Sequence, residues 1–77
     1  MEIKTKLGLR IKALREISSM SQKVLAYSAD LDRSYIASVE SGQRNVSIVN
    51  IEKIATALGV SVKEFFNDES FDEKKEL

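Results

Sequence analysis

Apolar residues recur along this 77-residue chain at helical spacing, and no segment alternates at period two for long enough to indicate a strand. The first periodic stretch covers about residues 2–17 and carries the stripe Ile3, Leu7, Ile11, Leu14 and Ile17. Leu9 and Gly8 do not fit this stripe. Gly8 weakens the helix locally and would allow close packing there. The pattern predicts four more short helices, over about residues 22–29, 33–41, 48–58 and 62–66. The helix over residues 48–58 carries the apolar stripe Ile48, Ile51, Ile54, Ala55 and Leu58. We therefore predict an all-α fold, a compact bundle of five helices.

Serine and aspartate residues, which can cap the N-terminus of a helix, lie where the later helices are predicted to begin. Ser21, Asp32 and Ser47 each precede one of them, and Ser and Asp side chains accept hydrogen bonds from the free N–H groups of a first helical turn. Ser61 and Glu64 have the spacing of a capping box before the last helix. These residues predict the starting points of four helices.

Two of the predicted helices, residues 22–29 and 33–41, are joined by a connection of only three residues. Helices joined this tightly cross steeply, and the crossing needs small and apolar side chains. The inward positions meet this need with Leu25, Ala26, Ala29, Leu31, Ile36 and Val39. Asp30, in the turn, is expected to adopt a left-handed backbone conformation, which Asp tolerates better than most residues. The outward positions of the second helix are Arg33, Ser34, Ala37, Ser38 and Ser41, a face slim enough for a DNA major groove about 12 Å wide.

The composition narrows the possible functions. The chain has no His and no Cys, which excludes a zinc finger, a cysteine nucleophile and an imidazole base. So short a chain has little room for an enclosed substrate pocket, and we expect a binding module that is not an enzyme and needs no metal or cofactor.

No apolar run approaches the roughly 18 residues of a membrane span, and residues 1–17 lack the apolar core of a signal peptide. These features predict a cytoplasmic protein that does not contact membranes.

The formal net charge of zero is the sum of two unequal parts. Residues 1–66 contain ten Lys or Arg and seven Asp or Glu, a net charge of +3. Residues 67–77 contain two Lys and five Asp or Glu, a net charge of −3. This division predicts a mildly basic domain over residues 1–66 and an acidic, flexible tail over residues 67–77, with Phe71 as the one residue expected to tether the tail.

Three motifs in register resemble the Cro/Xre-type helix-turn-helix regulators of phages and bacteria. Residues 21–26 read SQKVLA and resemble the opening of the first motif helix of that family. Residues 34–42 read SYIASVESG and resemble its recognition helix, and residues 51–61 read IEKIATALGVS and are similar to its fourth helix. Residues 31–36 and 44–47 further resemble the controller proteins of restriction–modification systems, which are small dimers without a sensor domain.

The resemblance implies a sequence-specific transcription regulator that binds double-stranded DNA, at a palindromic operator and as a homodimer. It implies base contacts for Arg33 and Ser34, and Arg is the usual reader of guanine edges. It implies further DNA contacts for Ser21, Gln22, Lys23, Tyr35, Ser38, Gln43, Arg44 and Asn45. Each of these residues could instead serve the fold alone, without touching DNA. Arg33, for example, could pair with Asp30 or with an acidic group near Glu40, and Tyr35 could pack its ring against the domain.

Two structural assignments also follow from the resemblance. Arg15 and Glu40 are expected to form an ion pair that fixes the recognition helix against the first helix. A dimer surface is expected around the last helix, where four large apolar residues occupy seven positions: Val60, Val62, Phe65 and Phe66. The alternative is that Val62 and Phe65 close the core of the monomer.

RNA polymerase is a further candidate partner, and the bacterial nucleoid is the expected location.

Three other functions remain open at this point. The chain could be the antitoxin of a toxin–antitoxin module, with a toxin bound by the tail. It could be a stand-alone repressor of the phage or plasmid type. It could also be a protein-binding scaffold that has lost DNA binding, in which case its binding to any DNA should show no salt dependence.

Overall fold

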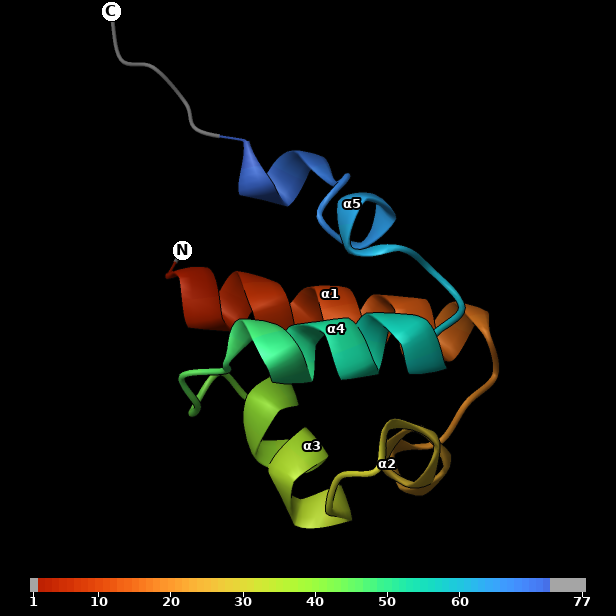
Figure 1. Ribbon diagram of the computed structural model, residues 1–77. Helices are drawn as coiled ribbons and strands as arrows, with labels where there is room; N and C mark the ends of the chain where they lie inside the picture. The colour runs from red at the N-terminus through yellow and green to blue at the C-terminus, as the bar shows by residue number, and fades with distance from the viewer. Residues whose placement is uncertain (1, 73–77) are drawn as a thin grey trace, which may run out of the picture.

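The computed structural model describes residues 2–72, which form five α-helices and one short 3-10 helix and contain no strand. The elements are α1 (Ile3–Ile17), α2 (Gln22–Ala29), α3 (Arg33–Glu40), α4 (Ile48–Ala57), α5 (Val62–Phe65) and η1 (Glu69–Phe71). The predicted all-α fold is confirmed, and each helix end lies within one residue of its predicted position. Figure 1 shows α2 and α3 at one end of the molecule and α5 at the opposite end. Within residues 2–72, no helix is both long enough and apolar enough to cross a membrane.

A single apolar core joins the helices. α3 packs against α1 and α2, α2 packs against α4, and α4 packs against α5. The largest fully enclosed side chains are Ile11, Leu25, Ile36, Val39, Ile54 and Phe65, and burial of such a side chain contributes roughly 1.5–3 kcal/mol. The inward positions predicted for the two motif helices are all buried, and Leu31 of the turn is half-buried against them.

The predicted apolar stripes are wrong at their ends. Ile3 and Ile17, in the first and last turns of α1, are 60% and 78% exposed, and Ile48 at the start of α4 is 65% exposed. Leu7 and Ile11, nearer the middle of α1, are buried. Helical spacing gives the face on which a residue lies, but only the neighbouring helices determine how far along that face the core extends.

The predicted serine caps are confirmed. The hydroxyls of Ser21 and Ser47 each accept a hydrogen bond at 3.1 Å from the backbone N–H three residues later. Ser61 and Glu64 form the complete capping box. Asp32 stands at the N-cap of α3 with an extended backbone, but its exposed carboxylate accepts no capping hydrogen bond. The prediction of a side-chain cap there is therefore wrong, since the carboxylate is directed to the surface and not to the first turn of α3.

Within residues 2–72, two residues other than glycine have a left-handed backbone at helix ends. Asp30 has φ 58° and ψ 46°, as predicted for the turn between α2 and α3. Ser19, after α1, has φ 54°, which was not predicted. In both places the next backbone N–H donates to a carbonyl five residues earlier at 2.9 Å, the hydrogen bond that closes a helix end. This bond offsets part of the roughly 1–2 kcal/mol cost of the conformation.

Gly8 marks the closest approach of α1 to α3. A Cβ atom at this position would lie 2.5 Å from the carbonyl oxygens of both Val39 and Glu40. Gly8 itself is buried. Gly8, which does not fit the apolar stripe of α1, therefore allows the backbone of this helix to lie directly against the last turn of α3.

The segment after α5 remains attached to the body. The ring of Phe71 meets the ring of Phe66 edge to face, with 5.1 Å between the centroids, which is the expected tether. Arg10 of α1 donates from Nε to the carbonyl of Phe65 at 2.8 Å, and its Nη1 lies 3.6 Å from Oδ1 of Asp68. The folded part thus extends past the predicted boundary at residue 66 through Asp72, and the rest of the predicted tail lies outside the described residues.

Candidate nucleic-acid interface

α3 presents a polar face at one end of the molecule because its opposite face is locked in the core. Ile36 and Val39 are 0% and 1% exposed and anchor the inner face. Arg33 and Ser34, in the first turn, are exposed. Among residues 2–72, the side chain of Arg33 forms no ion pair, so the alternative pairing with Asp30 is not present. The guanidinium of Arg33 is therefore available to a ligand.

Glu40, the last residue of α3, connects this helix to α1. Arg15 donates from Nε to Oε2 of Glu40 at 2.7 Å and from Nη2 to Oε1 at 3.1 Å. Its remaining nitrogen, Nη1, donates to the carbonyl of Met20 at 2.8 Å. The side chains of Arg15 and Glu40 are 13% and 5% exposed. The hydrogen bond to Glu40 raises the pKa of Arg15 against the lowering effect of burial, so the guanidinium keeps its positive charge at neutral pH.

Gln22 joins this network at the start of α2. Its Nε2 donates to Oε1 of Glu40 at 3.1 Å, and its side chain is half-buried. The hydroxyl of Ser21 already accepts from the N–H of Val24. The N–H groups of Gln22 and Lys23 have no acceptor inside the helix, and such a helix start favours an anion. The DNA contacts expected of Ser21, Gln22 and Lys23 stay predictions that this geometry permits.

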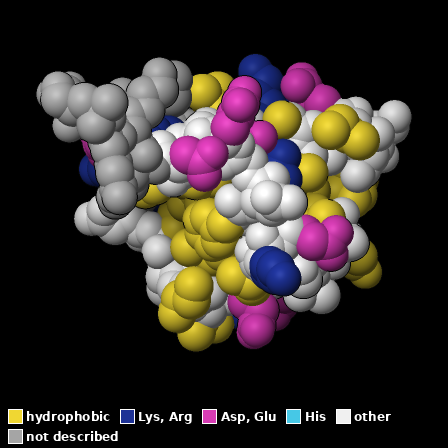
Figure 2. All heavy atoms as spheres, turned by 90° about the horizontal axis from the view of Figure 1, so that it is seen from above, with side chains coloured by type: hydrophobic (Ala, Val, Ile, Leu, Met, Phe, Trp, Pro, Cys, Tyr) yellow, Lys and Arg dark blue, Asp and Glu magenta, His cyan; other side chains and the backbone are white. Residues whose placement is uncertain are grey.

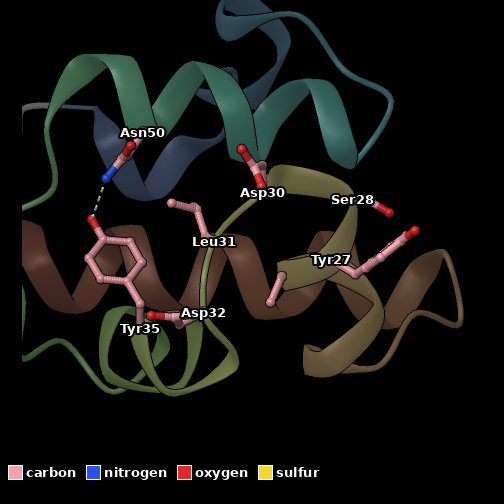
Figure 3. A pocket seen from close by; sticks show the side chains of 8 residues that line it. Tyr27, Ser28, Asp30, Leu31, Asp32, Tyr35 and Asn50 are labelled. Carbon is pink, nitrogen blue, oxygen red and sulfur yellow. Dashed lines mark hydrogen bonds between the residues drawn. The ribbon is translucent and has the colours of Figure 1, made fainter.

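The loop after α3 folds back onto the helix through Arg44. Its Nε donates to Oγ of Ser38 at 2.9 Å, and its guanidinium carbon lies 5.4 Å from the centroid of the Tyr35 ring, within the range of a cation–π contact. Ser38 donates its hydroxyl proton to the carbonyl of Tyr35 at 2.8 Å. Figure 3 shows Asn50 of α4, whose Nδ2 donates to the hydroxyl of Tyr35 at 3.1 Å. Three residues expected as separate DNA contacts thus form one cluster, which also includes Asn50.

The same loop carries the remaining candidate residues. Gly42 has φ 78°, and this left-handed conformation lets the N–H of Gln43 donate to the carbonyl of Ser38 at 3.0 Å. The side chains of Gln43, Arg44 and Asn45 are exposed. The loop therefore extends the polar surface of α3 beyond the end of the helix.

Two carboxylates lie beside the start of α3. Asp30 and Asp32 are exposed and line an open hollow of about 730 Å³ between the turn and α4, together with Tyr27 and Leu31 (Figure 3). Two negative charges make this hollow unfavourable for a DNA phosphate. The cationic side chains suited to DNA are Lys23, Arg33 and Arg44, none of which lines the hollow.

The four residues expected at a dimer surface do not share one environment. Phe65 is 0% exposed, and its assignment to a dimer surface is wrong because a side chain enclosed in its own subunit cannot touch another. Val60, Val62 and Phe66 are half-buried and pack at the edge of the core. Figure 2 looks onto the end of the molecule that carries α5 and shows hydrophobic side chains gathered there.

Sequence reasoning missed two residues that connect distant parts of the chain. Asn50 lies in the first turn of α4, off its apolar stripe, and its partner Tyr35 is 15 residues earlier. Arg10 lies off the stripe of α1, and its partner Phe65 is 55 residues later. Nothing in the surrounding sequence distinguishes either residue from an ordinary exposed helix residue, since each role depends on a tertiary contact.

The matches to known proteins agree with this geometry. Residues 11–65 match the helix-turn-helix family, a stretch that begins within α1 and ends with α5. The chain belongs to the helix-turn-helix family. This assignment confirms the Cro/Xre-type resemblance read from the three motifs, since the matched stretch contains all three.

Two curated relatives of this helix-turn-helix chain are named as control proteins. Control protein C.MunI of Mycoplasma sp is 47% identical over 68 residues, which cover 87% of this chain and 92% of the relative. Control protein C.BamHI of Bacillus amyloliquefaciens is 48% identical over 61 residues, which cover 78% of this chain and 75% of the relative. The resemblance to restriction–modification controller proteins is thereby confirmed.

Solved structures show the same helix-turn-helix fold. The crystal structure of the restriction–modification controller protein C.AhdI from Aeromonas hydrophila has a TM-score of 0.79 and 51% identity, over 82% of this chain and 96% of that chain. The controller protein C.Esp1396I, solved as a tetramer with its natural 35-base-pair operator, has a TM-score of 0.81 and 38% identity, over 86% of this chain and 87% of that chain.

Proposed function

We propose that this chain is the control protein of a restriction–modification system, a transcription regulator that binds a palindromic operator as a homodimer. The observation that carries this proposal is the first turn of α3, where Arg33 and Ser34 are exposed while Ile36 and Val39 anchor the helix from behind. A rigid helix of this kind can enter the major groove and read base edges. The operator complex of the relative C.Esp1396I supports the same use of the fold here.

The candidate residues divide into two roles in this proposal. Arg33 and Ser34 read base edges, since a bidentate Arg–guanine contact carries sequence information. Contacts to the DNA backbone fix the orientation of the domain. We assign these backbone contacts to residues 21–23 at the start of α2 and residues 43–45 in the loop after α3. The polarity and exposure of both segments, apart from the half-buried Gln22, support this assignment.

The homodimer extends the short site that one recognition helix can read. We propose that Val60, Val62 and Phe66 form its contact, with half-sites about 34 Å apart on the DNA. Phe66 lines a hollow of about 200 Å³ together with Arg44 and Asn45. The proposed dimer surface therefore adjoins the proposed DNA-binding loop, and a two-fold pair could present both recognition helices to one DNA duplex.

Binding of this kind needs no reaction chemistry, metal or cofactor, so we propose that the chain is not an enzyme. A regulator of transcription works on the nucleoid, in the bacterial cytoplasm, and we propose this location. RNA polymerase is the proposed protein partner, encountered where the operator lies beside a promoter. The names of the relatives favour this function over that of an antitoxin.

Arg33→Ala is expected to weaken binding to the operator by about tenfold and to relax base preference at one position in each half-site. Fluorescence anisotropy with a duplex selected by the wild-type protein from a randomised pool measures the affinity, and repeated selection with the variant measures the preference. Lys12→Ala, which removes an exposed cation from α1, is the matched control and should leave both unchanged. Equal weakening on every duplex would contradict base reading by Arg33 and indicate a phosphate contact instead.

A further inference from the structure

We infer that Asn50 is a positioning residue for DNA binding: through Tyr35, it holds the guanidinium of Arg44 ready to contact a DNA phosphate beside the recognition helix. This inference rests on the proposed function and adds to it a residue that does not itself need to touch DNA. Four side chains from α3, α4 and the loop between them carry the argument.

The first step is the hydrogen bond between α4 and α3. Nδ2 of Asn50 donates to the hydroxyl of Tyr35 at 3.1 Å, and both side chains are half-buried. Figure 3 shows the two residues facing each other, with the Tyr35 ring extending from α3 towards Asn50 on α4. A tyrosine ring has two side-chain torsions, so one hydrogen bond at its far end, together with packing at its base, fixes the direction of the ring.

The second step is the position of Arg44 against this ring. The guanidinium carbon lies 5.4 Å from the ring centroid, and Nε donates to Oγ of Ser38 at 2.9 Å. The hydroxyl proton of Ser38 goes to the carbonyl of Tyr35 at 2.8 Å, so the Ser38 oxygen presents a lone pair to Arg44. The guanidinium is thus held by a ring and by an acceptor that are both attached to α3.

The third step concerns the two guanidinium nitrogens of Arg44 that this arrangement leaves without a partner among residues 2–72. Nη1 and Nη2 of Arg44 have no hydrogen-bond or ion-pair partner among residues 2–72, and a guanidinium fork matches the oxygens of a phosphate. An arginine on an unrestrained loop loses side-chain freedom when it binds, and a restrained arginine has less freedom to lose. Asn50 therefore increases DNA affinity by lowering the entropic cost of the Arg44 contact.

A phosphate is the expected partner because Arg44 lies beyond the end of α3, whereas Arg33 lies at its beginning. A phosphate contact also predicts a specific experimental result. Loss of the contact weakens binding equally on every DNA sequence, and it lowers the slope of log K against log[salt] by about one.

The test is a double-mutant cycle in DNA affinity. Binding is measured by fluorescence anisotropy at several salt concentrations, with two probes: the duplex selected by the wild-type protein and a scrambled duplex of the same length and composition. Asn50→Ala and Tyr35→Phe remove the same hydrogen bond, and each is expected to weaken binding to both duplexes by about three- to tenfold. The double variant should bind no more weakly than either single variant. Asn67→Ala, which removes an exposed amide after α5, is the control and should bind like the wild type.

Arg44 supplies the second half of the cycle. Arg44→Ala should lower the salt slope by about one, whereas Asn50→Ala should leave the slope unchanged because the charge is still present. In the Arg44→Ala background, Asn50→Ala should cause no further loss of affinity. A residue that merely stabilises the fold would lower the melting temperature of Asn50→Ala without producing this dependence on Arg44.

Three outcomes would overturn the inference. These are additive losses for Asn50→Ala and Tyr35→Phe, a loss confined to the selected duplex, and an Asn50→Ala variant that binds like the wild type. Each of these three outcomes counts against the inference only when the wild-type protein itself prefers the selected duplex over the scrambled one. If the wild type shows no such preference and no salt dependence, the proposed function fails rather than this inference.

Discussion

Replacing Arg15 with alanine is expected to lower the free energy of unfolding by about 3 kcal/mol, the loss typical when one partner of a buried ion pair is removed. The carboxylate of Glu40 is only 5% exposed, and without Arg15 its one remaining side-chain donor among residues 2–72 is the amide of Gln22. The carbonyl of Met20 would also lose its hydrogen bond from Nη1. This loss is a large fraction of the roughly 5–15 kcal/mol that keeps small proteins folded.

Urea denaturation at 25 °C, followed by circular dichroism, measures this effect. Lys12→Ala, on the exposed side of α1, is the control and should stay within about 0.5 kcal/mol of the wild type. The double variant Arg15→Met, Glu40→Leu should regain much of the loss, because no unpaired charge is then buried. An Arg15→Ala protein as stable as the wild type would show that the pair does not hold α3 against α1. The same conclusion would follow if Glu40→Ala left both the melting temperature and the DNA affinity unchanged.

Gly8→Ala is expected to destabilise the protein by about 2 kcal/mol, although alanine favours a helix over glycine by about 1 kcal/mol. The added methyl group would lie 2.5 Å from two backbone carbonyl oxygens of α3. Backbone atoms in the last turn of a packed helix cannot move aside as a flexible side chain can. α1 and α3 must therefore separate, which would also disturb the nearby pair of Arg15 and Glu40.

The opposite substitution in the same helix provides the control for Gly8. Ala13 is exposed in α1, so Ala13→Gly should cost only about 1 kcal/mol, the ordinary difference in helix propensity. Thermal unfolding of both variants gives the comparison. If Gly8→Ala raises the melting temperature, the close approach of the two helices is not a constraint on this position.

Local chemistry explains what could be predicted from the sequence. Ser21, Ser47 and Ser61 cap helices through atoms three residues away, so the sequence alone contains both partners of each hydrogen bond. The left-handed backbone of Asp30 is likewise a property of a short turn. The fold class and the position of the recognition helix followed from such signals and from helical periodicity.

The features that escaped prediction depend on distant partners. Phe65 and Phe66 are adjacent and chemically identical, yet only Phe65 is fully enclosed, because the surrounding helices and not the spacing decide which ring points inward. Asn50 and Arg10 became recognisable only when the fold brought Tyr35 and Phe65 beside them. Contacts of this kind have no local pattern, so a single sequence does not reveal them.

Two copies of this chain are proposed to place their recognition helices in successive major grooves of one operator. Hydroxyl-radical footprinting of the wild-type protein on its selected duplex distinguishes such a pair from a single bound copy. We expect two protected half-sites related by two-fold symmetry, with centres one helical turn, or about 34 Å, apart. A single asymmetric protected segment, or no protection at concentrations that saturate binding, would show that the chain does not bind its operator as a two-fold pair.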